Sequence, residues 1–454
     1  MINCYGKIKK GYKTKILLDQ NHRVKMLKES DSKPKSNISQ DKTNECLIDE
    51  DDMILEEMQI YVTKLSNYDE RNIALEYFKD YLENDLMIPP EIFVTVHDFV
   101  LSLIQTELDE KTLCLCLDII EQIAEYINDE LNFSQIIERL CCFLPLQNAF
   151  NAISRIAQYH LSAAKFIVEI LPKLLMYFNS NDDDQQEGAL IILLSVLEHK
   201  SLIPDLINWV NIVFDIILSE NMNTFIICIQ ILTRFAETEI GYEQILQYTH
   251  LSVIFDKYKN QDEFIYWIIK FINTMISKTK NPLKFLESSN TTELIIQSVN
   301  NENKQIKKIM CELLYTLSCT EIGVNFLYNS NLLEKLFDWL NYPSFTISSK
   351  ALKILCSICS NSSSEILLTF YQKGFIDILN DYITSSNSDL LLEILKAIQT
   401  IINELKNQGL EEYLENIKEN NELIDSLWEI YETNHNNQIG IISSYIYYIL
   451  TEDN

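Results

Sequence analysis

The sequence from 304 to 402 decides the fold: KQIKKIMCELLYTLSCTEIGVNFLYNSNLLEKLFDWLNYPSFTISSKALKILCSICSNSSSEILLTFYQKGFIDILNDYITSSNSDLLLEILKAIQTII. A long apolar helix ending in LLYTLSC is followed by a polar break and two short helices, and the pattern recurs about 41 and then 43 residues later. Units of this length are typical of armadillo and HEAT solenoids, in which no unit buries its own apolar face and neighbours must stack. The sequence therefore predicts an all-α, right-handed armadillo/HEAT-type superhelical solenoid of about ten three-helix repeats.

Composition favours an almost wholly helical chain. Gly and Pro number only 8 each in 454 residues, and strand-like alternation is nearly absent. The longest apolar runs, such as ALIILLSVL at 189–197, are much shorter than the roughly 18 residues that a membrane span needs. The N-terminal sequence lacks the apolar core of a secretory signal. We expect a soluble intracellular protein without membrane insertion.

Neither the eleven cysteines nor the six histidines form a metal-binding or catalytic pattern. Cys356 and Cys359 have CxxC spacing, but they lie within an expected helix without a second pair or a histidine beside them. Small buried thiols in a reducing compartment are the better interpretation, and a metal or redox site is the weaker alternative. No paired acid and base, Gly-rich phosphate loop or nucleophile motif is present. We therefore expect no enzymatic activity, no cofactor and no metal.

The net charge of −29 is unevenly distributed along the chain. Residues 1–35 contain ten Lys/Arg against three Asp/Glu, whereas the remainder is strongly acidic. The acidic body argues against nucleic acid as the main partner. The basic segment is typical either of a nucleic-acid or targeting tail or of a peptide that docks on an acidic solenoid. We divide the chain into a basic arm at 1–30, a disordered polar and acidic linker at 31–52, and a solenoid with a C-terminal capping repeat at 53–454.

The order of these elements resembles that of importin alpha, the armadillo adaptor family of nuclear import. NYDERNIALEYFKDYLENDLMIPPEIFV at 67–94 is similar to the opening repeat of that family, and Gly374-Phe375-Ile376 to its recurring turn. NELIDSLWEIYETNHNNQIGIISSYIYYIL at 421–450 is similar to the capping repeat. The resemblance implies a monomeric adaptor of the cytoplasm and nucleus. It would bind cargo proteins through extended peptides in a concave groove, and importin beta through its basic N-terminal arm.

In that family the long inner helix of most repeats carries a Trp and, one turn later on the same face, an Asn. The resemblance places the Trp positions at Asp118, Asn151, Ile191, Gln230, Glu312 and Lys353. It places the Asn positions at Gln122, Arg155, Ser195, Arg234, Thr316 and Ser357. In the unit where the family has a basic residue, the pair is Lys270 and Thr274, and in the eighth unit it is Lys396 and Thr400. The importin-beta contacts would be Lys13, Lys15, Arg23 and Lys25.

The chain departs from the family at the groove itself. No Trp occupies a groove position, and Arg155 and Arg234 bring positive charge to the place where a basic signal would lie. The four tryptophans, Trp209, Trp267, Trp339 and Trp428, are predicted to be packing residues. These departures leave an alternative open: an armadillo-repeat protein-interaction scaffold with altered peptide specificity and no transport role.

Overall fold

The structure is a computed structural model of the 454-residue chain. It describes residues 50–451, apart from short gaps at 85–87, 107, 128–130, 218–220, 249–250, 259–260, 280–281, 289–290, 385–386 and 435–436. The predicted basic arm, with Lys13, Lys15, Arg23 and Lys25, lies outside the described residues, as does nearly all of the predicted linker. The first described helix already begins at Glu50, just before the predicted start of the solenoid.

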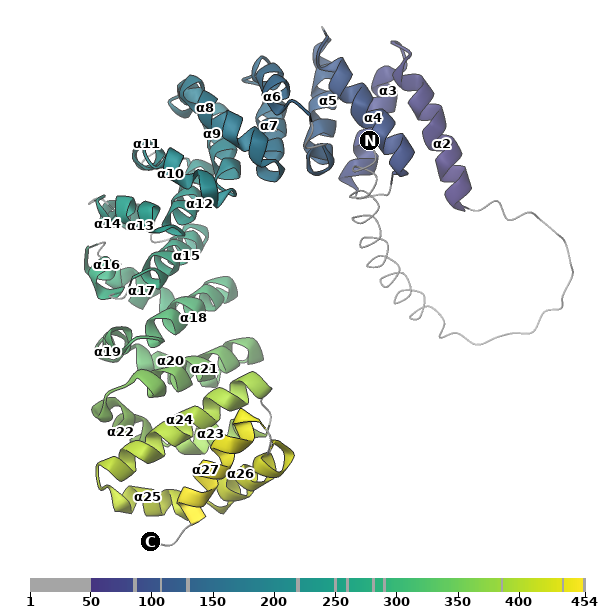
Figure 1. The fold of residues 1–454 in the computed structure, drawn as a ribbon. Helices are drawn as coiled ribbons and strands as arrows, with labels where there is room; N and C mark the ends of the chain where they lie inside the picture. Colours follow the sequence, from purple (N-terminus) through teal and green to yellow (C-terminus); the bar gives the residue numbers. More distant parts are fainter. Residues whose placement is uncertain are drawn as a thin grey trace, which may run out of the picture. The chain divides into compact units, whose positions relative to one another are not determined.

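Every regular element in the described part of the chain is a helix (Figure 1), which confirms the all-α prediction. The chain divides into two compact units, which we call unit 1 (Met1–Leu206) and unit 2 (Ile207–Asn454). Within each unit long helices pack side by side in chain order, as expected of an armadillo-type solenoid. None of the described helices is long and apolar enough to cross a membrane.

Unit 1 has one or two further helices between successive long helices. Its helices are α2 Glu50–Leu65, α3 Arg71–Glu83, α4 Pro90–Leu103, α5 Glu110–Ile123, η1 Ala124–Tyr126, α6 Phe133–Cys141, α7 Gln147–Tyr159, α8 Leu161–Phe178, α9 Asp183–Val196, η2 Lys200–Leu202 and α10 Ile203–Leu206. The long helices α3, α5, α7 and α9 pack against one another in that order. The stretches that contain a single further helix, α4 and α8, depart from the predicted three helices per repeat, whereas η1 and α6 between α5 and α7 agree with it. Helix α8 continues over 18 residues with Pro172 inside it, and it contains no Gly that would favour a corner between two short helices.

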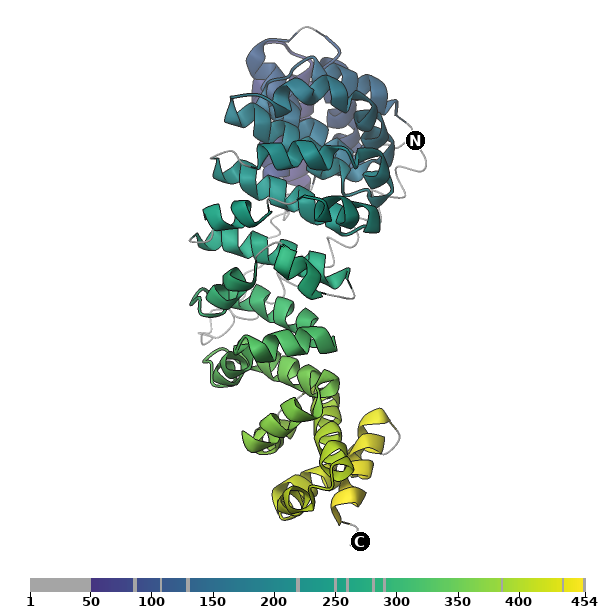
Figure 2. The ribbon, with the colours of Figure 1, turned by 90° about the vertical axis from the view of Figure 1, so that its left-hand side faces the viewer.

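Unit 2 contains the predicted three-helix repeats. Its helices are α11 Trp209–Ile216, α12 Met222–Ala236, α13 Glu239–Leu246, α14 Leu251–Tyr258, α15 Asp262–Ser277, α16 Pro282–Ser288, α17 Thr292–Val299, α18 Lys304–Ser318, α19 Glu321–Asn329, α20 Leu332–Leu340, α21 Phe345–Asn361, α22 Ser364–Gln372, α23 Phe375–Ile383, α24 Ser388–Asn407, α25 Glu411–Lys418, α26 Asn421–Asn434 and α27 Gln438–Thr451. The long helices α12, α15, α18, α21, α24 and α27 follow one another, each packed against the next (Figures 1 and 2). Two further helices lie between successive members of this series, and all of them except α26 are shorter than the long helices.

A repeated Thr-Glu-Ile-Gly sequence makes the sharp turn after two of the long helices. The Gly241 and Gly323 N–H groups donate to the hydroxyls of Thr238 and Thr320, at 3.2 and 3.1 Å. A Cβ atom on either glycine would lie 2.1 Å from a backbone carbonyl oxygen of the preceding long helix. Only glycine therefore lets the next helix leave at this angle. The two copies of this motif lie 82 residues apart, about twice the repeat length, so the corner follows the period of the solenoid.

The predicted turn at Gly374-Phe375-Ile376 is present before α23. Gly374 has a φ of +71°, in the left-handed region that glycine occupies without strain. Asn331 takes the same conformation, with a φ of +55°, directly before the corresponding helix α20. Asn is the residue that most often replaces Gly there.

Within each unit, hydrogen bonds between residues about one repeat apart in the sequence join neighbouring repeats. In unit 1 Thr112 donates to the Asn72 side chain at 2.7 Å, 40 residues away. In unit 2 Thr316 donates to the Asn273 side chain at 2.7 Å, and the Tyr382 hydroxyl donates to the Leu340 carbonyl at 3.3 Å, over 43 and 42 residues. The sequence period thus reappears as contacts between stacked repeats.

Among the described cysteines Cys142 and Cys319 are exposed, contrary to the prediction, whereas several others on the long helices are buried in the apolar core, as predicted. They are Cys116, Cys228, Cys311, Cys356 and Cys359. Burial raises the pKa of the Cys116 thiol to about 12 and that of Cys311 to about 11, so both remain protonated at neutral pH. Among the described residues no group of three or more His, Cys, Asp or Glu side chains is arranged to hold a metal ion.

Candidate peptide-binding surface

The predicted groove residues lie on the long helices and, with one exception, reach solvent at least in part. In unit 1, α5, α7 and α9 carry Asp118, Gln122, Asn151, Arg155, Ile191 and Ser195, all of them half-buried. In unit 2, α12, α15, α18, α21 and α24 carry Gln230, Arg234, Lys270, Thr274, Thr316, Lys396 and Thr400, which are half-buried, and Glu312 and Lys353, which are exposed.

Ser357 is the exception. Its side chain is 7 % exposed, and its hydroxyl lies 2.9 Å from the Ser318 hydroxyl and donates to the Ser318 carbonyl at 3.3 Å. It joins α18 to α21 and faces the inside of the stack. A peptide on the surface of the long helices would not reach it.

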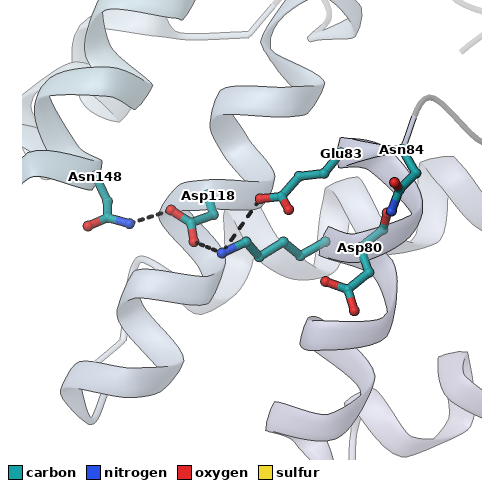
Figure 3. A network of polar contacts seen from close by, with 6 residues as sticks. Asp80, Glu83, Asn84, Asp118 and Asn148 are labelled. Atoms are coloured by element: carbon teal, nitrogen blue, oxygen red, sulfur yellow. Dashed lines mark hydrogen bonds and ion pairs between the residues drawn. The ribbon is translucent and has the colours of Figure 1, made fainter.

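In unit 1 the groove position Asp118 is bonded to its neighbours on both sides (Figure 3). The Lys79 ammonium of α3 lies 2.6 Å from one carboxylate oxygen, and Asn148 of α7 donates to the other. Lys79 also reaches Glu83, at 3.6 Å. The hydrogen bond to Asp118 is the main cause that raises the pKa of Lys79 above its usual value, so the ammonium form is favoured. These contacts connect three successive long helices through side chains.

A second polar contact set of unit 1 lies one helical turn further along α5 and α7. Burial raises the pKa of the Glu121 carboxyl, while a hydrogen bond from Asn151 and the charge of Arg155 oppose that rise. Arg155 in turn donates to Gln158 at 2.8 Å and lies 5.4 Å from the ring of Tyr159. The predicted groove residues Asn151 and Arg155 are therefore engaged by their own neighbours.

In unit 2 a groove of about 690 Å³ lies between α15 and α18. One wall is formed by α15 and the other by the start and middle of α18. The lining residues are Asp262, Glu263, Tyr266 and Trp267 on one side and Asn303, Gln305, Ile306, Lys308, Ile309 and Glu312 on the other. Glu312 is one of the predicted groove residues, whereas the other lining residues were not predicted to lie in a groove.

Trp267 is part of this groove, so its prediction as a packing residue is wrong. The Tyr266 ring meets the indole edge to face at 5.3 Å, and the Lys270 ammonium lies 4.7 Å from the indole centre. Trp267 precedes Lys270 by three residues, and positions i and i+3 share one face of a helix. The spacing of three residues from the predicted groove position Lys270 could have identified Trp267 as a groove residue.

Trp339 behaves as predicted and packs inside unit 2. It is 5 % exposed, and the Lys307 ammonium lies 5.8 Å from its ring and 5.1 Å from that of Tyr342. Lys307 itself is buried, with Glu302 3.6 Å away. This cluster joins α18 to α20.

The comparisons with known proteins support the fold. No family model matches the chain, and no curated protein matches it. The crystal structure of an engineered protein from the Northeast Structural Genomics Consortium is similar over 87 % of this chain and 99 % of its own, with 14 % identity and a TM-score of 0.66. Two designed armadillo repeat proteins, one in complex with the peptide (KR)4, are similar over 51 % and 50 % of this chain, at 14 % and 13 % identity, with TM-scores of 0.46 and 0.44. These two cover 99 % and 100 % of their own chains.

The chain has an all-helical armadillo-type repeat fold. This statement rests on its own repeats of stacked long helices and on the likeness to the engineered protein. Because all these likenesses are below 25 % identity, they concern the fold alone. Membership of the importin alpha family stays a prediction.

Proposed function

We propose that this protein is a protein-interaction scaffold that binds an extended peptide in the groove between α15 and α18. The observation that carries the proposal is the size and lining of that groove, which at about 690 Å³ holds several side chains of a ligand. Its lining combines aromatic and polar side chains, which binding sites use for affinity and orientation.

The lining indicates what kind of peptide fits. The exposed carboxylate of Glu263 favours a basic side chain, as does that of Glu312, which the Lys350 ammonium already approaches to 3.4 Å. Trp267 and Ile309 provide apolar area for the aliphatic stem. The exposed amide of Gln305 can exchange hydrogen bonds with an extended backbone. The Lys270 ammonium already lies against Trp267, so a cationic ligand side chain must share or displace that contact.

The test is peptide binding by the full chain with two variants that each remove an aromatic side chain. Fluorescence anisotropy would measure the affinity for a basic extended peptide and for an acidic peptide of equal length. Trp267→Ala should weaken binding of the basic peptide by about tenfold, as loss of a central aromatic anchor does. Tyr68→Ala, which removes an aromatic side chain of unit 1 that is 73 % exposed, should leave it unchanged. Equal effects of the two variants, or tighter binding of the acidic peptide, would contradict the proposal.

A second candidate is a nuclear-import adaptor of the cytoplasm and nucleus. The observation in its favour is the contrast between the basic residues 1–35 and the acidic remainder of the chain, in the order that resembles importin alpha. In this function the arm binds importin beta and the groove binds the peptide of a cargo protein. Full-length protein should then bind importin beta, and replacement of Lys13, Lys15, Arg23 and Lys25 by Glu should abolish that binding. No binding by the unaltered protein would leave the scaffold function alone.

A further inference from the structure

Helix α27 carries an exposed apolar stripe. Ile441, Tyr445 and Tyr448 are 63 %, 43 % and 49 % exposed. Their spacing of four and three residues places them on one face of the helix. Contiguous exposed apolar side chains of this kind mark interaction sites more often than accidental surface.

The stripe continues sideways onto α26 through a chain of ring contacts. The Tyr448 ring lies 5.8 Å from that of Tyr447, which lies 5.1 Å from the indole of Trp428. Trp428 is 39 % exposed and also touches Tyr431, at 5.5 Å. We call Trp428, Ile441, Tyr445 and Tyr448 the aromatic patch.

Comparison with the preceding long helix shows that the patch replaces polar residues. The Tyr445 hydroxyl donates to the Asn403 side chain of α24 at 3.0 Å, across 42 residues. At the same spacing Ile441 and Tyr448 correspond to Gln399 and Lys406 of α24. The face that α24 fills with Gln, Asn and Lys is therefore apolar in α27. Because none of these residues lines the groove between α15 and α18, the patch is a separate site.

The helices around the patch are strongly acidic. Between 411 and 451 the single Lys or Arg is Lys418, which pairs with Glu415 at 2.9 Å. Against it stand Glu411, Glu412, Glu415, Glu419, Glu422, Asp425, Glu429 and Glu432. Exposed Glu429 follows Trp428 directly in α26. An apolar surface in this field favours a partner that combines apolar anchors with positive charge.

We propose that the aromatic patch docks an amphipathic basic α-helix of a partner protein. A straight stripe on one helix is complementary to the stripe of a second helix, since the ridges of one fit the grooves between side chains of the other. Lys and Arg on the flanks of the partner helix meet the acidic residues of α25 and α26. A second copy of this chain is disfavoured as the occupant, because a symmetric contact would bring two acidic surfaces together.

The probe is a fluorescein-labelled Leu/Lys peptide of about 18 residues, with Leu at helical spacing on one face. Anisotropy titrations with the full chain would compare it with a scrambled peptide of identical composition and with a Leu/Glu peptide of the same pattern. The unaltered protein should bind the helix-forming Leu/Lys peptide, and the other two much more weakly. The double variant Tyr445→Ser/Tyr448→Ser should bind it at least about tenfold more weakly.

The matched control is Ile240→Ser/Val253→Ser, which removes side chains that are 50 % and 57 % exposed on α13 and α14 and should leave binding unchanged. Ile441→Lys should also weaken binding, because it adds positive charge to the patch. It leaves the Tyr445–Asn403 hydrogen bond intact, so it tests the proposal even if the tyrosine variant misfolds. Equal binding by the patch variants and the unaltered protein would overturn the proposal, as would equal binding of the scrambled or acidic peptide. A dimer in analytical ultracentrifugation that the patch variants abolish would instead assign the patch to a second copy.

Discussion

Both units expose a surface formed by neighbouring long helices, but the side chains of that surface are arranged differently in each unit. In unit 1, Asp118 on α5 is bonded to Lys79 on α3 and Asn148 on α7, so the polar side chains of neighbouring long helices satisfy one another. In unit 2, where Thr316 of α18 also bonds to Asn273 of α15, a groove with Trp267 in its wall lies between these two helices. The surface between two neighbouring long helices can therefore either stabilise the stack through its own side-chain contacts or leave a groove for a ligand.

The turns differ in the same way. Unit 2 divides its repeats at corners such as Gly241 and Gly323, where a Cβ atom would overlap a carbonyl oxygen. In unit 1 one long helix, α8, fills the place that two short helices take in unit 2, with Pro172 inside it. The number of helices between successive long helices thus varies, while the long helices stack in the same order.

The largest expected effect is on the glycine corners. Gly323→Ala should lower the free energy of unfolding of unit 2 by about 3 kcal/mol, because the Leu317 carbonyl that the new methyl group meets belongs to a helix and cannot move aside. Peptide-resolved hydrogen exchange would assign the loss to α18 and α19. Gly409→Ala is the control, since nothing lies within 4 Å of the new atom and only its φ of +65° opposes the change, by about 1 kcal/mol. Equal losses in the two variants would contradict the steric argument.

A smaller effect is expected from the polar contacts of unit 1. Asp118→Ala should lower its free energy of unfolding by about 1–2 kcal/mol, because Lys79 and Asn148 lose a charged partner in a half-buried place. The contribution of the raised Lys79 pKa is complete below its ordinary value of 10.5 and disappears as the pH rises through the higher pKa of the folded state. Denaturant titrations should therefore show the free energies of unfolding of the unaltered protein and of Asp118→Ala converging above pH 10.5. Glu83→Ala, which removes a more exposed partner 3.6 Å from Lys79, should cost less than about 0.5 kcal/mol.

The smallest effect concerns the two arginines at predicted groove positions. Arg155 donates to Gln158, and Arg234 lies 3.1 Å from Glu237, so each guanidinium is held by a residue three positions later on its own helix or at its end. Replacing both by Asn should raise the affinity for a Lys-rich peptide by about threefold, because two like charges leave the surface. Isothermal titration calorimetry would measure the change, with Lys335→Asn on α20 as the control. No change would place both side chains outside the path of the peptide.

The sequence predicted the fold well because the fold depends on local periodicity. Long apolar helices about 40 residues apart are visible in the chain, and stacking follows from their unburied faces. The site was predicted less well, because the side of a helix on which a residue lies changes by about 100° with each position. Ser357 was expected at the groove and is buried against Ser318, whereas Trp267 was expected in the core and lines the groove.

By itself the sequence determined the helical repeats and the burial of several cysteines, which follow from residue type and spacing, and the resemblance indicated the turn at Gly374-Phe375-Ile376. Tertiary structure alone decided that the polar residues of α3, α5 and α7 bond to one another and that α15 and α18 leave a groove. It also decided that Ile441, Tyr445 and Tyr448 stay exposed. The physical reason is that period and composition identify the helices, while the rotation and separation of packed neighbours determine which side chains meet.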